Sequence, residues 1–338
     1  MTTEELNSIK QEVRNAFSNI RFNKENHQYI YQGVILESSS AFRSEFENSF
    51  EAYFSAESKY KSNLKHNPET KRTAAYYRER WDLLGQEART RGTRVHLFSE
   101  TYPDFEEPSC PKERGVVEFF EQLDPKYILL FQELIMFDAE FYKAGTADMI
   151  FLNTETGNLV IGDWKTNDKS VFECYKGKSL RGEFKVYKDT GYNKYSMQMS
   201  HYQYILEKCT RFKVEDRWLI WLSTSSKKKD HKDYSYQKIN AILKGKCFRS
   251  YSCRNMTEKI ANSLESRREK IIMNLKQEPL SKGKLSLESL DSLKGMLPEL
   301  PKAPSIKKFT FNTVKENSKK KEAIEKTKRK STDSYDLD

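Results

Sequence analysis

The spacing of apolar residues changes along the chain, and this change separates a helical part from a strand-forming part. Between residues 39 and 100, large apolar side chains recur at the three- or four-residue steps of a helix face, as in Phe42, Phe46, Phe50 and Phe54. Before this region, short apolar runs at 20–22, 29–31 and 33–36 predict a small β-hairpin. The first hundred residues are therefore expected to hold a hairpin followed by helices.

The centre of the chain has a different pattern, in which short apolar runs alternate with turn-forming residues. After a predicted helix at Gly115–Leu123, three runs predict strands, namely Tyr127–Phe137, Gly145–Leu152 and Leu159–Trp164. The pattern then predicts a helix, two strands and a closing helix, at Tyr195–Cys209, Arg217–Ser223, Tyr234–Ile239 and Met256–Leu275. This order of elements predicts an α/β (α+β) fold, with a central mixed β-sheet flanked by helices.

Charge and proline content divide the chain into four parts. Residues 1–90 are expected to form an N-terminal hairpin and helical subdomain, and residues 91–280 the core. Residues 281–300 are interpreted as a linker, since three prolines near residue 300 mark a hinge. Residues 301–338 contain eleven basic and six acidic residues and almost no apolar ones, which predicts a disordered basic tail.

Composition narrows the class of protein. The 338 residues include 59 Lys and Arg against 49 Asp and Glu, a formal charge of +10, of which the tail holds half. Nucleic acid is therefore a candidate partner, although net charge alone does not establish it. No run approaches 18 apolar residues, and the N-terminus has no apolar signal region, which argues against membrane and secreted proteins. Five scattered Cys suit a reducing compartment, so we expect a cytoplasmic protein.

Two aspartates and a lysine are expected to meet at the central hairpin. The turn-forming stretch 153–158 has its midpoint at 155.5, and so does the pair Asp148 and Asp163, which a regular hairpin would place opposite each other. Lys165 lies two residues after Asp163 and therefore on the same face of the strand. Opposed carboxylates need neutralisation, which a divalent cation supplies. The alternative is that these are ordinary charges at solvent-facing strand ends.

Two further pairs have the spacing of one helical turn. His96 and Glu100 are separated by four residues, and so are Gln198 and Tyr202. Without further information, the first is most simply a surface ion pair and the second a stripe of packed side chains. A role in a functional site is the other interpretation of both.

In chain order, these segments resemble the motifs of the PD-(D/E)xK nuclease superfamily, in particular its RecB-like branch with a Q-x-x-x-Y helix. The matching residues are His96 in R-G-T-R-V-H, Glu133 in F-Q-E-L, Asp148 in A-G-T-A-D, Asp163 and Lys165 in G-D-W-K, and Gln198 and Tyr202 in Q-M-S-H-Y. The resemblance covers residues 92–239, with a weaker likeness at 29–42. It implies a restriction-endonuclease-like core behind the N-terminal subdomain. The Lys-rich composition is similar to that of phage-encoded members.

The resemblance implies a Mg²⁺-dependent deoxyribonuclease, expected to be an exonuclease in DNA recombination, repair or processing. The implied metal ligands are His96, Asp148, Asp163 and the backbone carbonyl of Trp164, with Mn²⁺ able to substitute. Glu133 and Lys165 would complete the catalytic set, and Gln198 and Tyr202 would contact DNA. Recombination or replication proteins are expected partners, in the host cytoplasm if the protein is phage-encoded. The alternative is a catalytically silent DNA-binding or virion structural protein that keeps the fold.

The cysteines and one basic, aromatic segment are further candidates for ligand binding. An iron–sulfur cluster needs four gathered thiolates, and since the five cysteines contain no C-x-x-C, we expect no cluster. Residues 167–193 are basic and aromatic, which suits contact with single-stranded DNA or a duplex end. A solvated loop with a few packed aromatic side chains explains this segment equally well.

Overall fold

The computed structural model describes residues 1–167, 171–222 and 241–268. The chain divides into one compact unit, Met1–Pro279, and a second, Leu280–Asp338, whose residues all lie outside the described part. The predicted strand Tyr234–Ile239, the end of the predicted helix Met256–Leu275, the linker and the tail also fall outside the described residues.

The described residues form a nine-stranded mixed sheet and a separate two-stranded sheet. The strands of the large sheet are β1 (Ile20–Asn23), β2 (Gln28–Tyr31), β3 (Val34–Ser38), β4 (Tyr127–Asp138), β5 (Lys143–Asn153), β6 (Leu159–Lys165), β9 (Val214–Leu222), β10 (Leu243–Lys244) and β11 (Phe248–Ser252). The small sheet pairs β7 (Cys174–Ser179) with β8 (Lys188–Thr190).

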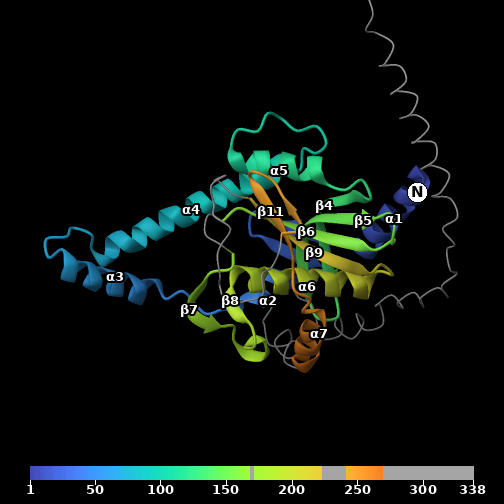
Figure 1. The fold of residues 1–338 in the computed structure, drawn as a ribbon. Helices are drawn as coiled ribbons and strands as arrows, with labels where there is room; N and C mark the ends of the chain where they lie inside the picture. Colours follow the sequence, from blue (N-terminus) through green and yellow to red (C-terminus); the bar gives the residue numbers. More distant parts are fainter. Residues whose placement is uncertain (168–170, 223–240, 269–338) are drawn as a thin grey trace, which may run out of the picture. The chain divides into compact units, whose positions relative to one another are not determined.

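Seven α-helices and a short 3₁₀-helix accompany the sheets in the described residues. They are α1 (Thr3–Ala16), α2 (Ser39–Ser44), α3 (Ala52–His66), α4 (Ala74–Ser99), α5 (Pro111–Gln122), η1 (Gly182–Phe184), α6 (Gly191–Cys209) and α7 (Thr257–Ser266). Helix α6 lies along one face of the sheet and α5 along the other, while α3 and α4 extend away from the sheet (Figure 1). Within the described part of the chain, none of the helices has both the length and the apolar content that a membrane span requires.

Local sequence explains where these elements begin and turn. The side-chain oxygen of Thr2 caps α1 in a capping box with Glu5, and Thr73 and Thr190 accept backbone N–H groups at the starts of α4 and α6. Gln32 and Gly33 both have positive φ, which is the backbone of the tight turn that joins β2 to β3. The predicted hairpin is therefore a three-stranded meander.

Strand β5 organises the sheet around the candidate site. Its whole length pairs antiparallel with β4 on one edge. On the other edge, β3 pairs in parallel with Lys143 and Ala144, and β6 pairs antiparallel with Met149–Leu152. The partners of β5 on this edge thus separate at residues 145–148. Strand β6 continues the sheet through a parallel pairing with β9.

Two apolar layers hold the helices on the sheet. On the α6 side, the packed residues include Ile150, Ile161, Tyr202 and Leu219. On the α5 side, Phe119 packs against Trp164 with ring centroids 5.3 Å apart, in a layer that also contains Phe151 and Trp218. Alternate side chains of the central strands therefore enter different cores, which fixes the face on which the remaining polar side chains emerge.

The structure confirms the predicted fold class, a mixed sheet flanked by helices. The helical region at 39–100 is three helices separated by two connections. The domain boundary predicted at residue 90 falls inside α4, and the N-terminal meander belongs to the same sheet as the core strands. Residues 1–90 are joined to the core in this way because β3 pairs directly with β5.

Candidate active site

A row of three carboxylates crosses three neighbouring strands. In the β5–β6 hairpin, Met149 pairs with Gly162, so Asp148 and Asp163 are the next opposed pair. The register predicted from the sequence is therefore the register that the structure has. Both side chains are buried, with 9 % of Asp148 and 2 % of Asp163 exposed, so neither is an ordinary charge at a solvent-facing strand end.

Glu133 extends this row onto β4. The pairs on either side of it join Gln132 to Met149 and Leu134 to Ala147, which places Glu133 opposite Asp148. Its backbone has φ of 47°, in the left-handed region that non-glycine residues seldom adopt. Such backbone strain persists where surrounding structure imposes it and is concentrated at functional sites. The sequence pattern of β4 alone does not indicate this conformation.

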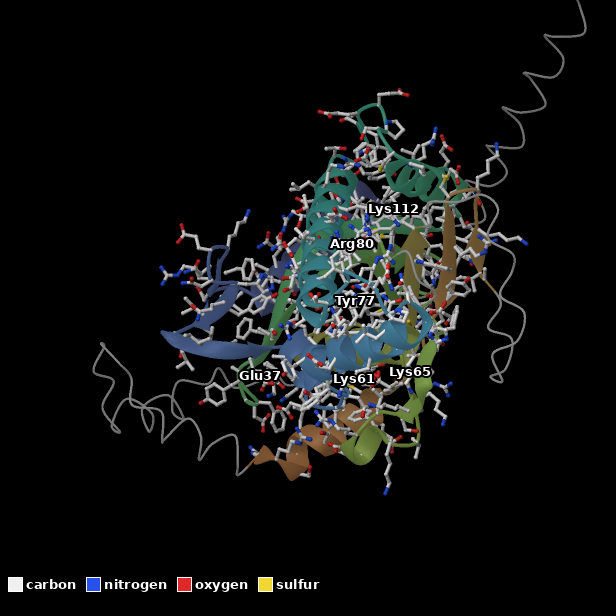
Figure 2. The ribbon with its side chains drawn as sticks, turned by 90° about the vertical axis from the view of Figure 1, so that its left-hand side faces the viewer. Glu37, Lys61, Lys65, Tyr77, Arg80 and Lys112 are labelled. Carbon is white, nitrogen blue, oxygen red and sulfur yellow. The ribbon has the colours of Figure 1, made fainter. Side chains whose placement is uncertain are left out.

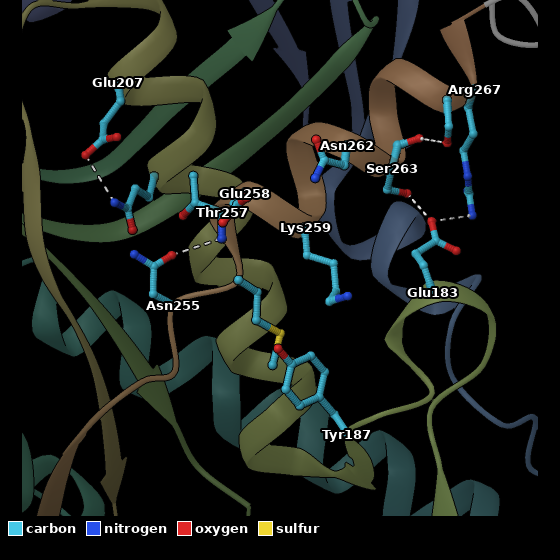
Figure 3. A pocket seen from close by; sticks show the side chains of 13 residues that line it. Glu183, Tyr187, Glu207, Asn255, Thr257, Glu258, Lys259, Asn262, Ser263 and Arg267 are labelled. Atoms are coloured by element: carbon cyan, nitrogen blue, oxygen red, sulfur yellow. Dashed lines mark hydrogen bonds and ion pairs between the residues drawn. The ribbon is translucent and has the colours of Figure 1, made fainter.

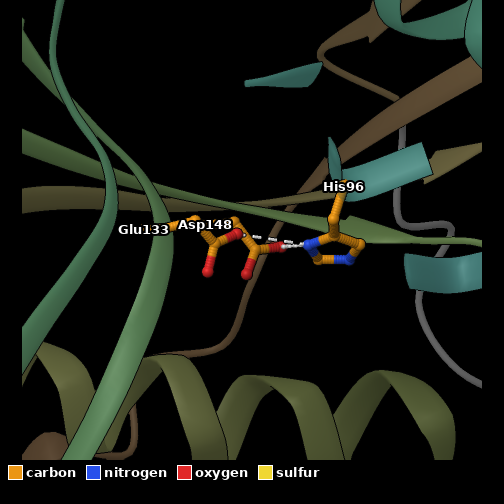
Figure 4. A group of neighbouring side chains, drawn as sticks. All are labelled: His96, Glu133 and Asp148. Carbon is orange, nitrogen blue, oxygen red and sulfur yellow. Dashed lines mark hydrogen bonds and ion pairs between the residues drawn. The ribbon is translucent and has the colours of Figure 1, made fainter. Parts of the chain in front are cut away.

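His96 approaches the row from the C-terminal part of α4. Its Nδ1 lies 3.4 Å from Oε1 of Glu133 and 3.7 Å from Oδ2 of Asp148. The three side chains point toward one another (Figure 4), and their ligand atoms all lie within 4.8 Å of each other. His96 thus pairs with the carboxylate row and does not form the surface ion pair with Glu100 that its spacing alone suggested.

Lys165 neutralises the other end of the row. Its ammonium forms an ion pair with Asp163 and lies 4.6 Å from the centre of the Tyr195 ring. Burial opposes the charge of Lys165, but Asp163 and Asp148 outweigh burial and raise its pKa above the usual value. Lys165 is therefore a fixed cation at neutral pH.

The row also perturbs the groups at its centre. Burial, followed by the charge of Asp163, raises the pKa of Asp148 to about 7. For His96, burial favours the neutral ring, but the charge of Asp148 and the hydrogen bond with Glu133 raise the pKa to about 9. Burial and then a neighbouring like charge cause the first shift, and the attraction of the carboxylates for a cation causes the second. Both shifts indicate a site that favours added positive charge.

Gln198 and Tyr202 lie behind the row on α6. Nε2 of Gln198 donates to the Tyr202 hydroxyl at 2.7 Å, and the Tyr202 ring is buried against β5. A Cβ at Gly145 would lie 2.5 Å from Cε1 of Tyr202, so only glycine permits this approach. The pair is thus part of the packing that supports β5, and its predicted contact with DNA stays a prediction.

Arg43 is a site residue that the sequence analysis missed. It reaches from α2 and donates from Nη1 to Oε1 of Gln198 at 2.6 Å, while its guanidinium lies 5.9 Å from the centre of the Tyr195 ring. Tyr195 therefore lies beside two cations, Arg43 and Lys165. No motif in the sequence marks Arg43 as a site residue.

The converging ligand atoms share two members, His96 and Asp148, with the predicted set of His96, Asp148, Asp163 and the Trp164 carbonyl. His96 and Asp148 are present, Glu133 joins them, and Asp163 is paired with Lys165 beside them. Trp164 donates its backbone N–H to Asp148 Oδ2 at 2.7 Å, and its ring packs in the α5-side core. Two carboxylates and an imidazole suit a hard divalent cation, and the nitrogen suits Mn²⁺ as well as Mg²⁺. The residues present therefore fit the predicted metal.

The segment at 171–193 shows packed aromatic side chains where DNA contact was one of two interpretations. Phe184 is fully buried and 6 % of Tyr192 is exposed, while Phe172 packs 5.3 Å from the Tyr192 ring. These three rings contribute to the core of the protein. Stacking on DNA bases would need rings that are open to solvent.

A pocket of about 960 Å³ lies apart from the carboxylate row (Figure 3). It is lined by α6, α7 and the η1 segment, and Glu183 in its wall accepts hydrogen bonds from Ser263 and Arg267. None of the residues of the carboxylate row lines it. Two of its charged side chains, Glu183 and Arg267, pair with each other, and the His96, Glu133 and Asp148 cluster lies elsewhere.

Comparison with known proteins adds no relative to this description. No family model matches the chain, and no curated protein matches it.

Proposed function

We propose that this protein is a Mg²⁺-dependent deoxyribonuclease of the PD-(D/E)xK type. The observation that carries the proposal is the row of Glu133, Asp148 and Asp163 across three strands, flanked by Lys165 and His96. We further infer a cytoplasmic exonuclease that acts in DNA recombination, repair or processing, following the RecB-like motifs. Mn²⁺ would substitute for Mg²⁺.

The residues have separable roles in this proposal. Asp148, Glu133 and His96 would hold the cation, because their ligand atoms converge. A bound Mg²⁺ would supply neutralisation of the scissile phosphate and activation of the attacking water. Asp163 keeps Lys165 in place through their ion pair. It would also add negative charge next to the ligands, which favours cation binding.

Lys165 would act as an electrostatic group. Its raised pKa keeps the ammonium protonated at neutral pH, so it donates hydrogen bonds and cannot serve as a general base. With 15 % of its side chain exposed, it lies at the border between the carboxylate row and solvent. A phosphate that meets the row would come within reach of this charge, which stabilises the negative charge that develops during hydrolysis.

The scaffold around the row would keep these groups in position. Trp164 N–H holds one oxygen of Asp148, and Tyr202 fills the space over Gly145 where β3 and β6 separate. Arg43 links α2 to this arrangement through Gln198. Precise placement by such contacts is what a hydrolytic site requires, since small displacements of reacting groups lower the rate strongly.

The test uses labelled linear and circular duplexes with Mg²⁺, Mn²⁺ or EDTA. Loss of the linear substrate only with a divalent cation, and not of the circle, supports the exonuclease proposal. Cleavage of both substrates would replace exonuclease by endonuclease. Binding of DNA without cleavage under any of the metal conditions would contradict the proposal and favour the catalytically silent DNA-binding alternative.

A further inference from the structure

Helices α3 and α4, with the connection between them, form an arm that extends from the sheet (Figure 1). We define the α3–α4 arm as Ala52–Ser99. Its two helices pack on each other, and α4 also packs on α5 near its C-terminal end. From residue 82 to residue 90, every position of α4 except Gly85 is exposed. The arm therefore has a large surface that the described part of the chain does not cover.

Aromatic side chains emerge from this surface. The exposed fraction is 58 % for Tyr53, 69 % for Phe54 and 42 % for Tyr76. Just before the arm, 67 % of Phe50 is exposed, although its ring lies 5.3 Å from that of Trp81. Exposed large rings gathered on one element usually mark a contact surface. Burial in this protein's own core does not explain them.

The arm is also basic, and many of its cations are unpaired. It contains ten Lys and Arg against five Asp and Glu, a net charge of +5, which equals that of residues 1–300 as a whole. Lys61, Lys65 and Arg80 are exposed and form no ion pair with any residue that the structure describes, and Figure 2 labels them on the arm together with Tyr77. Elsewhere, Lys143, Lys165, Lys194 and Lys208 form ion pairs, as in Lys208 with Asp138 at 2.8 Å.

Helix α4 connects this surface to the carboxylate row. Tyr76 is in its first turn and His96 near its end, twenty residues later, which corresponds to a distance of about 30 Å along the helix. About nine stacked nucleotides span this length at 3.4 Å each. A strand that lay along α4 would thus reach the row with one end.

We propose that the α3–α4 arm binds single-stranded DNA and guides it toward the carboxylate row. The lysines and arginines neutralise phosphates, and Phe54, Tyr53 and Tyr76 stack on bases. A single strand is favoured over a duplex because duplex bases already stack on each other and have no free faces. A protein partner is not favoured, because unpaired cations among aromatic rings match a polyanion with flat bases. The guidance of DNA toward the carboxylate row rests on the proposed function, whereas the binding of DNA to the arm does not.

The test is fluorescence anisotropy with labelled (dT)₂₀ in EDTA, which measures binding without cleavage. The full chain is used throughout, so that the basic tail contributes equally to every variant. Phe54→Ala/Tyr76→Ala should weaken binding by about 5- to 150-fold for each stacked base that is lost. Val186→Ala/Ile242→Ala is the matched control, since 69 % and 45 % of these side chains are exposed away from the arm.

A second pair of variants tests the charges. Lys61→Ala/Lys65→Ala should reduce the slope of log K against log salt by about 1.4, because each phosphate contact on a single strand contributes about 0.7. Lys244→Ala/Lys246→Ala removes two exposed lysines at the far edge of the sheet and should leave the slope unchanged. Melting temperatures of all variants should match that of wild type, because the changed residues are exposed.

Unchanged affinity and slope in both arm variants would overturn the proposal. A shift in oligomeric state by light scattering, with DNA binding unchanged, would also overturn it and identify a protein contact instead. Equal losses with a 20-bp duplex would contradict the preference for single strands. If the arm variants behave as expected but no DNA is cleaved with Mg²⁺, the binding surface stands and the proposed nuclease function fails.

Discussion

Removing the charge of Asp148 is expected to stabilise the metal-free protein. The pKa of Asp148 is raised from 3.8 to about 7, with burial as the main cause and Asp163 next. Above pH 7, the ionised carboxylate therefore destabilises the folded state by about 4 kcal/mol relative to a neutral group. In Asp148→Asn, the amide oxygen can still accept the Trp164 N–H, so the fold keeps that bond.

The direction with pH follows from the raised pKa. Below about pH 3, Asp148 is protonated in both the folded and the unfolded state, so the substitution changes little. As pH rises from about 4 to 7, only the unfolded state releases this proton, so the folded wild type loses stability that the variant keeps. We therefore expect Asp148→Asn to raise the free energy of unfolding by about 2–4 kcal/mol in EDTA at pH 8. Saturating Mg²⁺, at 100 times its Kd, should stabilise wild type by about 2.7 kcal/mol and leave the variant unchanged.

Urea denaturation followed by circular dichroism measures both effects. Asp138→Asn is the matched control, since Asp138 is also buried at the end of a neighbouring strand but accepts from Lys208 at 2.8 Å. Neutralising Asp138 removes the buried one of the two carboxylates that pair with Lys208, the other being Glu140, and should destabilise the protein. If Asp148→Asn destabilises the metal-free protein as Asp138→Asn does, or if Mg²⁺ still stabilises it, the reasoning about the carboxylate row is refuted.

Three further predictions follow from single contacts. Lys165→Ala should lower the rate of Mg²⁺-dependent cleavage by about 10²–10³. Mg²⁺ should still raise the melting temperature of this variant, because Lys165 is not among the converging ligands. Loss of the thermal shift would assign Lys165 to cation binding instead. Gly145→Ala should lower the free energy of unfolding, measured by urea denaturation, by about 1–3 kcal/mol, because its Cβ would overlap the buried Tyr202 ring. Gly85→Ala, on the open face of α4, should be neutral or stabilising. Equal effects of the two substitutions would contradict the close approach of Gly145 to Tyr202. His201 is fully buried, with no hydrogen-bond partner for either ring nitrogen among the described residues, and burial, followed by the charge of Lys143, lowers its pKa to about 3. Between pH 7.5 and pH 5 wild type should therefore lose about 2 kcal/mol relative to His201→Phe, since only the unfolded state takes up this proton, and parallel pH profiles for the two proteins would show that the ring is protonated in the fold.

The register of the central hairpin is the part of the site that could be predicted from sequence. The turn at 153–158 is rich in turn-forming residues and both flanking strands are apolar, so a one-residue slip would move every buried side chain to the wrong face. That constraint alone places Asp148 opposite Asp163. The spacing of apolar residues and the positions of turn-forming residues likewise sufficed to predict most of the strands and helices.

Glu133 and Arg43 show what the pattern could not supply. The left-handed backbone of Glu133 lies in the middle of the β4–β5 pairing, where the sequence pattern predicts an extended strand, and no local sequence signal indicates it. Arg43 reaches Gln198 across 155 positions of sequence, because α2 packs on α6. The arm was predicted as helix, but its exposure depends on which helices find a partner. Contacts between elements distant in sequence determine the position of Arg43 and the exposure of the arm, and the spacing of residues along the chain does not report such contacts.

The most direct measurement of the central claim is single-turnover cleavage of a labelled linear duplex by wild type and by Asp163→Ala, with Mg²⁺ and with EDTA. Matching circular dichroism spectra and a cooperative melt would show that the variant is folded. Wild type should digest the substrate completely with Mg²⁺ and not at all in EDTA, and the variant should lose at least about 10² in rate. Digestion by Asp163→Ala at the rate of wild type, or by wild type in EDTA, would contradict that claim.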